Sequence, residues 1–197
     1  MTTGFEGSLA LQLVAGFGLA AATGLRAFLP PLLVGLLARL DVVPLRPGTA
    51  WLESTPALVI FGTAVVLELL ADKIPWVDHA LDVAAIVVKP TAATLVVVAT
   101  MTDMSPLTAT IVGLLLGGTV AGSVHVARAG LRLISTGTTG GLANPILSVA
   151  EDGLSVVIVL VAIFAPLLLI LIGVGLFLLI RRGRRRRPAR PRRRVPV

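Results

Sequence analysis

Residues 9–40 read LALQLVAGFGLAAATGLRAFLPPLLVGLLARL, an apolar stretch that is interrupted in its middle by residues 24–31. The run from Leu9 to Leu19 is followed by small alanines, as in a secretory signal peptide. The preceding residues contain Glu6 and no Lys or Arg, whereas a signal peptide begins with a positive segment. We therefore expect a first transmembrane helix that stays in the protein, followed after the glycine-and-proline break by a short apolar half-helix at residues 28–40.

The composition of the whole chain is that of a membrane protein. Hydrophobic residues make up 56% of the 197 residues, charged residues make up 14%, and the mean hydropathy is +0.98. A soluble domain of this size has too much wet surface for so many apolar side chains. Residues 146–150, like residues 28–40, form an apolar piece that is too short to cross a bilayer. We predict an all-α membrane protein with about five transmembrane helices and two half-helices, the later spans being residues 56–71, 83–101, 106–127 and 154–180.

The net charge of +7 is concentrated at the C-terminal end of the sequence. Ten of the 17 basic residues lie between Arg181 and Val197, and the rest of the chain has a net charge of −3. This distribution argues against nucleic-acid binding by a folded domain. We expect a membrane domain at residues 1–180 and a disordered Arg/Pro-rich tail at residues 181–197 that binds anionic lipid. By the positive-inside rule the tail lies in the cytoplasm, and the protein lies in the plasma membrane, the inner membrane of a bacterium.

The sequence repeats itself at a fixed spacing. Val14-Ala15-Gly16 and Gly24-Leu25-Arg26 recur as Val120-Ala121-Gly122 and Gly130-Leu131-Arg132, and a break that contains proline follows each copy. If residues 28–40 do not cross the bilayer, the N-terminus lies outside and the copies form an inverted-topology repeat, as in many transporters. If residues 28–40 cross, the copies are parallel and the N-terminus lies inside. The rule that orients the tail also places residues 40–55 and 102–105 inside and residues 72–82 and 128–153 outside.

Two ionisable residues lie within the predicted spans, where charge is costly. Lys89 lies six residues into the span that begins at residue 83, and it precedes Pro90, which should kink the helix. Glu68 lies near the outer end of the preceding span, with Asp72 four residues later on the same helical face. Intramembrane charges normally face a partner or a water-filled cavity, so we expect Glu68 and Lys89 to bind a solute or to pair with each other. The alternative for Lys89 is a side chain that reaches outward to the membrane interface.

Further polar residues flank the two breaks. Arg26 follows the first span and could meet an anionic group, and Asn144 with Pro145 is a good helix start whose free N–H groups could face a ligand. On the outer side, a cluster of carboxylates could attract cations or relay protons. A surface loop remains an alternative for Asn144, and a solvated acidic loop remains one for the carboxylates. The candidate ion- or substrate-binding residues are Lys89, Glu68, Asp72, Arg26, Asn144 and Glu151, and the outer acidic cluster comprises Asp78, Asp82 and Asp152.

The sequence contains no recognisable catalytic motif. It has no His-Glu-x-x-His, no nucleophile elbow and no phosphate-binding loop, and it has no cysteine. The spacing of its carboxylates matches no EF-hand. We therefore expect neither an enzyme nor a bound metal or cofactor. Gly113 and Gly117 form a small-xxx-small pair that permits close helix packing, either within the chain or in a homo-oligomer.

Several of these motifs resemble a known family. The segments GLRAFLP at residues 24–30 and ADKIP at residues 71–75, with Lys89-Pro90 and Asn144-Pro145, are similar to an uncharacterised bacterial family of integral membrane proteins. The family is filed as Domain of Unknown Function 4126, and the resemblance covers roughly residues 9–166. It implies a multi-span membrane protein and carries no activity onto these positions.

Three hypotheses of function remain open from the sequence. The first is a small transporter or channel for an ion or a small anionic solute, in which Lys89 and the half-helices line a mid-membrane site and Glu68 with Asp72 forms an outer gate. The second is a membrane scaffold or accessory subunit that transports nothing. The third is an anionic-lipid flippase, in which Arg26 and Lys89 meet a phosphate headgroup.

Overall fold

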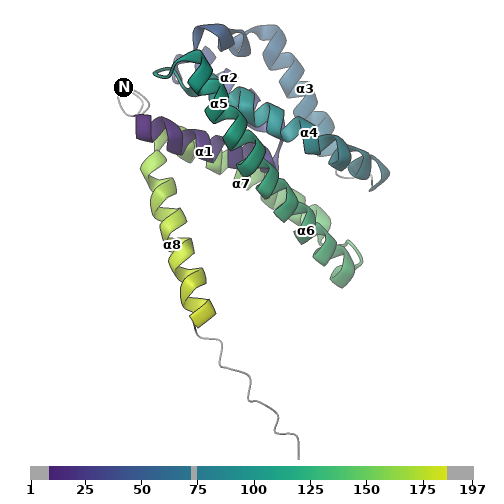
Figure 1. Ribbon diagram of the computed structural model, residues 1–197. Helices are drawn as coiled ribbons and strands as arrows, with labels where there is room; N and C mark the ends of the chain where they lie inside the picture. Colours follow the sequence, from purple (N-terminus) through teal and green to yellow (C-terminus); the bar gives the residue numbers. More distant parts are fainter. Residues whose placement is uncertain (1–8, 72–74, 186–197) are drawn as a thin grey trace, which may run out of the picture.

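The computed structural model describes residues 9–71 and 75–185, which form helices joined by short turns, with no strand among them (Figure 1). The prediction of an all-α protein is confirmed for this part of the chain. The helices in chain order are α1 (Leu9–Leu25), α2 (Leu29–Arg39), the 3₁₀ helix η1 (Pro47–Glu53), α3 (Thr55–Ala71), α4 (Pro75–Thr100), α5 (Pro106–Leu116), the π-helical segment η2 (Gly117–Ala121), α6 (Gly122–Thr139), α7 (Asn144–Phe164) and α8 (Pro166–Arg185).

Helix α1 lies at the centre of the helical body, in contact with α4, α7, η2 and α6, whereas α8 extends away from the body (Figure 1). Leu19 of α1 packs in one apolar cluster with Val159 of α7, and Ala20 of α1 packs in a second cluster with Val97 of α4. The small residues of α1 let these neighbouring helices approach closely. The sequence of α1 is apolar around most of its circumference, so the helix packs against several neighbours and still has Phe17 directed outward.

The loop between α2 and η1 closes one end of the body. The Arg46 guanidinium donates hydrogen bonds to the carbonyl oxygens of Met101 (2.6 Å) and Met104, just beyond the C-terminal end of α4. Near the start of α1, the Gln12 amide donates to Asp103 Oδ2 at 2.6 Å. We call this the Arg46 end. The chain leaves the Arg46 end along α1 and returns to it along α2.

The two copies of the repeat run in the same direction. Gly16 of α1 packs against Leu116, and Gly24 packs against Ala121 and Val124, so positions advance together along α1 and along α5–α6. The inverted repeat is therefore not confirmed. The start of α1 lies at the end that holds residues 40–55 and 102–105, which is the arrangement expected for the parallel alternative. The start of α1 lies at this end because α2, although it has only 11 residues, leads the chain back to the Arg46 end.

The first predicted half-helix is present as α2, but the second is not a separate element. Residues 146–150 belong to α7, which begins at Asn144 with Pro145 in its first turn and continues unbroken to Phe164. No proline follows Pro145 until Pro166, so nothing removes a hydrogen-bond donor from the helix interior. Pro166 lacks an N–H group and separates α7 from α8, so residues 154–180 form parts of two helices.

The predicted span at residues 106–127 is the first part of a longer helix. Residues Pro106–Thr139 form a continuous helix of 34 residues. The π-helical segment η2 changes the hydrogen-bond ladder locally and does not end the helix. The helix ends at Gly140, which has a left-handed conformation with φ of 62°.

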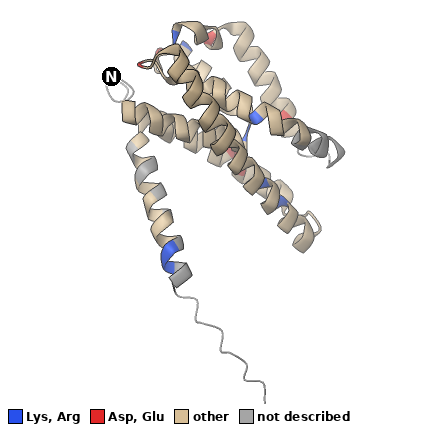
Figure 2. Cartoon of the chain, viewed as in Figure 1, with Lys and Arg blue, Asp and Glu red and all other residues tan. Residues whose placement is uncertain are grey.

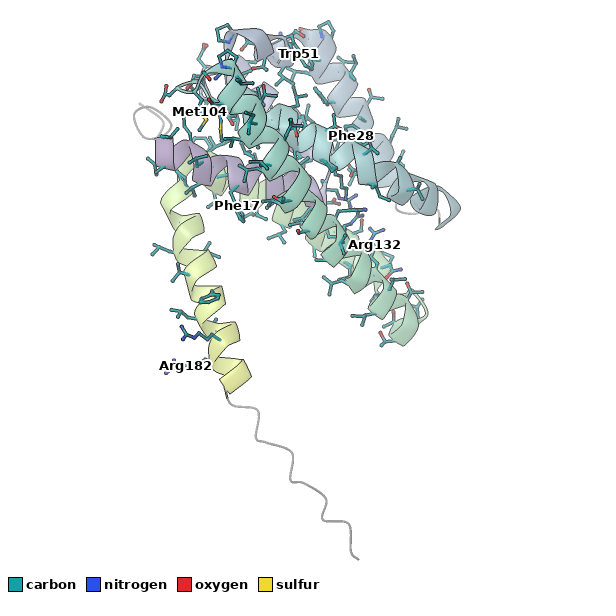
Figure 3. All side chains as sticks on the ribbon, viewed as in Figure 1. Phe17, Phe28, Trp51, Met104, Arg132 and Arg182 are labelled. Carbon is teal, nitrogen blue, oxygen red and sulfur yellow. The ribbon has the colours of Figure 1, made fainter. Side chains whose placement is uncertain are left out.

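The surface of the helical body is apolar, as expected of a protein surrounded by lipid. Apolar side chains project outward from the helices, and Phe17, for example, is 54% exposed (Figure 3). By length and composition, three helices are able to cross a membrane: residues 83–100 of α4, Pro106–Thr139 and α7. A fourth span results if η1 and α3, which meet at a bend of 62°, count as one. The described residues thus contain three to four candidate spans, and the count of five stays a prediction.

The Gly113/Gly117 pair packs against α4 inside the chain. Thr94 of α4 donates a hydrogen bond from its hydroxyl to the carbonyl oxygen of Gly113 at 3.1 Å. A Cβ atom on Gly117 would lie 2.5 Å from Thr94 Oγ1 and 2.6 Å from the carbonyl oxygen of Pro90. These contacts leave no room for a side chain, so the pair serves close packing between α4 and α5–η2.

We predict that Gly117→Val destabilises the protein strongly while Gly118→Val does not. A Cβ on Gly117 meets backbone, which cannot rotate away, so the overpacking penalty should be about 3 kcal/mol or more. At about 2–4 °C per kcal/mol, the melting temperature in detergent should fall by at least about 6 °C. Gly118 has no atom within 4 Å of its added Cβ and serves as the matched control. Equal melting temperatures for the two variants would contradict this packing.

Candidate functional site

The break between α1 and α2 exposes the unpaired ends of two helices inside the body. Residues 26–28 separate Leu25, the last residue of α1, from Leu29, the first residue of α2. The last carbonyl groups of a helix and its first N–H groups have no partner within the helix. In a low-dielectric surrounding each such group costs several kcal/mol unless another group binds it. Two charged side chains from other helices meet this requirement.

Lys89 of α4 binds the end of α1. Its ammonium Nζ donates to the carbonyl oxygens of Gly24 and Leu25, each at 3.0 Å, and the residue is only 1% exposed. The C-terminal end of a helix carries a partial negative charge, which a cation complements. Lys89 therefore faces buried backbone partners instead of reaching outward to the membrane interface, and its role in binding a solute stays a prediction.

Glu68 of α3 binds the start of α2. Its Oε1 accepts a hydrogen bond from the Ala27 N–H at 3.0 Å, and its Oε2 accepts one from the Phe28 N–H at 3.4 Å. The N-terminal end of a helix carries a partial positive charge, which a carboxylate complements. The two ionisable residues predicted from the sequence thus hold the two sides of one break: Lys89 holds α1 and Glu68 holds α2.

Arg26, within the break, joins α1 to α7. It is 1% exposed, and its guanidinium donates to the Ser148 hydroxyl at 2.7 Å and to the Ser148 carbonyl oxygen at 3.3 Å. The guanidinium also forms an ion pair with the Asp152 carboxylate. The Ser155 hydroxyl, one turn further along α7, donates to the Ala22 carbonyl oxygen at 3.1 Å. The expected anionic partner of Arg26 is therefore a residue of the chain itself.

A pocket of about 190 Å³ opens beside these contacts. Three charged residues, Arg26, Glu68 and Asp152, contribute to its lining, and the Asp152 side chain is 29% exposed. Lys89 does not line the pocket, because its side chain is directed to the end of α1. The rest of the wall is mainly aliphatic and consists of Leu29, Val65, Leu69, Gly153 and Val156. The pocket therefore combines a cation, two carboxylates and an apolar surface.

The pocket lies near the C-terminal end of α3 and in the first half of α7. Glu68 follows the start of α3 at Thr55 by 13 residues, and Asp152 precedes the end of α7 at Phe164 by 12 residues. At about 1.5 Å per residue these spacings correspond to about 18–20 Å. The hydrocarbon core of a bilayer is about 30 Å thick, so a charged pocket about 18–20 Å from these helix ends falls within that thickness.

A second group of buried charges lies between α6 and α7. Glu151 Oε2 accepts from Arg128 Nε at 2.7 Å and from Arg132 at 3.5 Å. Arg128 and Arg132 are 5% and 8% exposed. Figure 2 shows how few residues of the helical body are charged and that basic residues lie along α6, where Figure 3 labels Arg132. Charges at this burial in an apolar body need the partners that these contacts supply.

The structure brings together some of the sequence-predicted site residues and separates others. Glu68, Arg26 and Asp152 share the pocket, whereas Glu151, next to Asp152 in sequence, points to the α6 arginines. Asn144 is not at the pocket: its side-chain amide donates to Thr136 Oγ1 at 3.1 Å, at the turn between α6 and α7. Asp72 and Glu6 lie outside the described residues, as do the side chains of Asp78 and Asp82.

Sequence reasoning missed three residues of these networks. Ser148 lies four residues before Asp152, and Arg128 lies four residues before Arg132, so each pair shares a helical face. This spacing could have identified them if residues 128–153 had been considered helical and buried rather than an outer segment. Within the described ranges, no group of three or more His, Cys, Asp and Glu side chains is arranged to hold a metal ion.

One comparison with known proteins identifies a family for the chain. A family model described as a domain of unknown function, DUF4126, matches residues 13–186 of the chain. No curated protein and no solved structure matches it. The match includes the α1–α2 break, Glu68, Lys89 and the whole of α7. The chain belongs to the DUF4126 family.

Proposed function

We propose that this protein is a small transporter or channel for an ion or a small anionic solute, and that its binding site is the pocket beside the α1–α2 break. The observation that carries the proposal is the position of Arg26, Glu68 and Asp152 around one cavity between apolar helices. Ionisable residues at such a position are expensive and characteristically mark the path of a solute or ion. A helix break that lines a polar cavity at the midplane is also typical of transporters.

The residues of the pocket suggest how it binds a solute. An anion would take its main contact from the Arg26 guanidinium and would compete with Asp152 for it. A cation would instead lie between the Asp152 and Glu68 carboxylates. The volume of about 190 Å³ is below the roughly 300–1,000 Å³ of pockets that bind drug-sized ligands. The site therefore suits a small ion or a solute of a few non-hydrogen atoms.

The two alternative functions receive less support. A scaffold requires a dry and fully packed interior, whereas the pocket leaves Asp152 partly exposed within the body. A lipid flippase requires a lateral opening that includes Arg26 and Lys89. The groove of about 410 Å³ between α4 and α5–η2 is lined by other residues, among them Pro90, Thr94 and Leu114.

We also propose the membrane arrangement that the charge distribution favours. The Arg-rich segment at residues 181–197 lies on the cytoplasmic side and binds anionic lipid, and the chain is a multi-pass protein of the plasma membrane. We propose no catalytic role for the chain.

A flux measurement with Glu68→Gln tests the proposal. Native protein in liposomes should carry at least one solute of a panel of chloride, acetate, phosphate, sodium and potassium faster than protein-free liposomes do. Glu68→Gln keeps an acceptor oxygen for the α2 amides and removes the charge from the pocket, so flux of that solute should change about tenfold or more, as for a contact of about 1.4 kcal/mol. The flux of a cation should fall, because it loses an attractive contact, and the flux of an anion should rise, because it loses a repulsive one. Glu53→Gln, an exposed carboxylate outside the pocket, is the matched control and should carry the solute at the native rate. Native flux equal to that of empty liposomes would overturn the proposal.

A further inference from the structure

A continuous polar seam runs between α6 and α7. On α6 its members are spaced by three, four and three residues and therefore share one face: His125, Arg128, Arg132 and Ser135. On α7, Glu151 faces this row, and the next residue, Asp152, pairs with Arg26. The four α6 residues are each 5–8% exposed. The ion pairs of Glu151 with Arg128 and Arg132 join the two sides of the seam.

The opposite face of α6 is apolar and exposed. Val126, Leu133 and Ile134 are 69%, 74% and 64% exposed. Helix α6 therefore has its polar face buried and its apolar face outward, as in a membrane protein with a polar path inside. Packing alone does not require this arrangement, because aliphatic residues would fill the seam at lower cost than two arginines.

The seam leads from the turn between α6 and α7 to the pocket. Ser135 lies near the turn, and Glu151, the α7 member of the seam, directly precedes Asp152, which lines the pocket with Arg26. From Ser135 to His125 the α6 face covers ten residues, or about 15 Å. The Ser135 Oγ is buried and has no hydrogen-bond partner among the described residues. Buried hydroxyl groups are rarely left in this state unless water reaches them.

We propose that this seam is a water-accessible route by which an anion moves between the α6–α7 turn and the pocket, with Arg128 and Arg132 selecting for negative charge. The inference rests on the proposed transport function and names the charge of the solute. Arginine does not release its proton in proteins, so a row of arginines cannot relay protons. Rings and rows of arginine are the usual lining of anion-selective pores.

Cysteine accessibility tests the seam directly, because the native chain contains no cysteine. Ser135→Cys is a nearly isosteric probe, and Leu133→Cys, on the exposed apolar face of the same helix, is the matched control. Each variant in liposomes is treated with a sulfonate-bearing and a trimethylammonium-bearing methanethiosulfonate reagent, and each rate is divided by the rate with free 2-mercaptoethanol. The cysteine at position 135 should react at least tenfold faster than the one at position 133. It should also favour the anionic reagent at least tenfold, and adding Arg132→Gln should reduce this preference.

The outcomes separate the seam from the transport function. Labelling at position 135 that is no faster than at position 133, or that favours the cationic reagent, overturns the seam. The labelling does not depend on flux, so a protein that carries no solute and still shows the anionic preference contradicts the transport function and supports the seam. A protein with Glu68-dependent flux and no labelling at position 135 retains the pocket and loses this route.

Discussion

Replacement of Lys89 by methionine is expected to lower the free energy of unfolding by about 2–5 kcal/mol. Methionine matches the length of the lysine stem and removes the donors that bind the carbonyl oxygens of Gly24 and Leu25. Unsatisfied backbone groups in an apolar surrounding cost several kcal/mol each, and relief from burying the ammonium offsets part of that loss. At about 2–4 °C per kcal/mol, the melting temperature in detergent should fall by about 4–20 °C.

Lys89→Arg provides the control for this experiment, since it keeps a charged donor at the same position. It should recover part of the lost melting temperature, because a guanidinium can still donate to the end of α1. Thr91→Val, an exposed neighbour on α4 outside the break, should melt close to the native protein. A native melting temperature for Lys89→Met would show that the end of α1 does not depend on this side chain.

The second large effect concerns the ion pair between Arg26 and Asp152. Arg26→Met should cost about 2–4 kcal/mol, because it leaves a carboxylate in the pocket without its guanidinium. This free-energy cost is smaller than that of breaking a fully buried ion pair, because the Asp152 side chain is 29% exposed. The double variant Arg26→Met/Asp152→Asn should be more stable than the sum of the single effects predicts, with a coupling energy of at least about 1 kcal/mol.

The adjacent carboxylate supplies a matched control for this cycle. Glu151 precedes Asp152 in sequence and pairs with Arg128 and Arg132 instead of Arg26. The effects of Arg26→Met and Glu151→Gln should therefore add to within about 0.5 kcal/mol. Chemical unfolding of each variant in mixed micelles gives the required free energies. Equal coupling of Arg26 to both carboxylates would contradict the assignment of one acid to each network.

Two residues of the α1–α2 break, Lys89 and Glu68, could be predicted from the sequence, because charged residues are costly in a membrane. Lys89 and Glu68 stood out because they lie within apolar spans, and both have the buried partners that this cost requires. The break after Gly24 and the short helix α2 followed from the proline pair at residues 30–31. What the spacing could not show is that the two residues serve the same break, because that depends on how α3 and α4 pack against α1.

The second repeat copy shows where local sequence patterns are insufficient. Arg26 lies in a break, whereas its counterpart Arg132 lies within α6, although the residues that precede them are the same. The two differ because prolines follow Arg26 within five residues, whereas α6 meets no proline or left-handed glycine until Gly140. Both arginines nevertheless meet carboxylates of α7, Asp152 for Arg26 and Glu151 for Arg132. This similarity of partners could not be recognised without the position of α7.

The flux of small ions through liposomes that contain equal amounts of folded native or Glu68→Gln protein tests the central claim most directly. If the pocket at the α1–α2 break carries the solute, the native protein should exceed empty liposomes and Glu53→Gln should match the native protein. Glu68→Gln should differ from the native protein about tenfold or more, with a lower flux for a cation and a higher flux for an anion. Equal flux in the native and Glu68→Gln proteins, with both folded, would contradict the assignment of the pocket as the binding site.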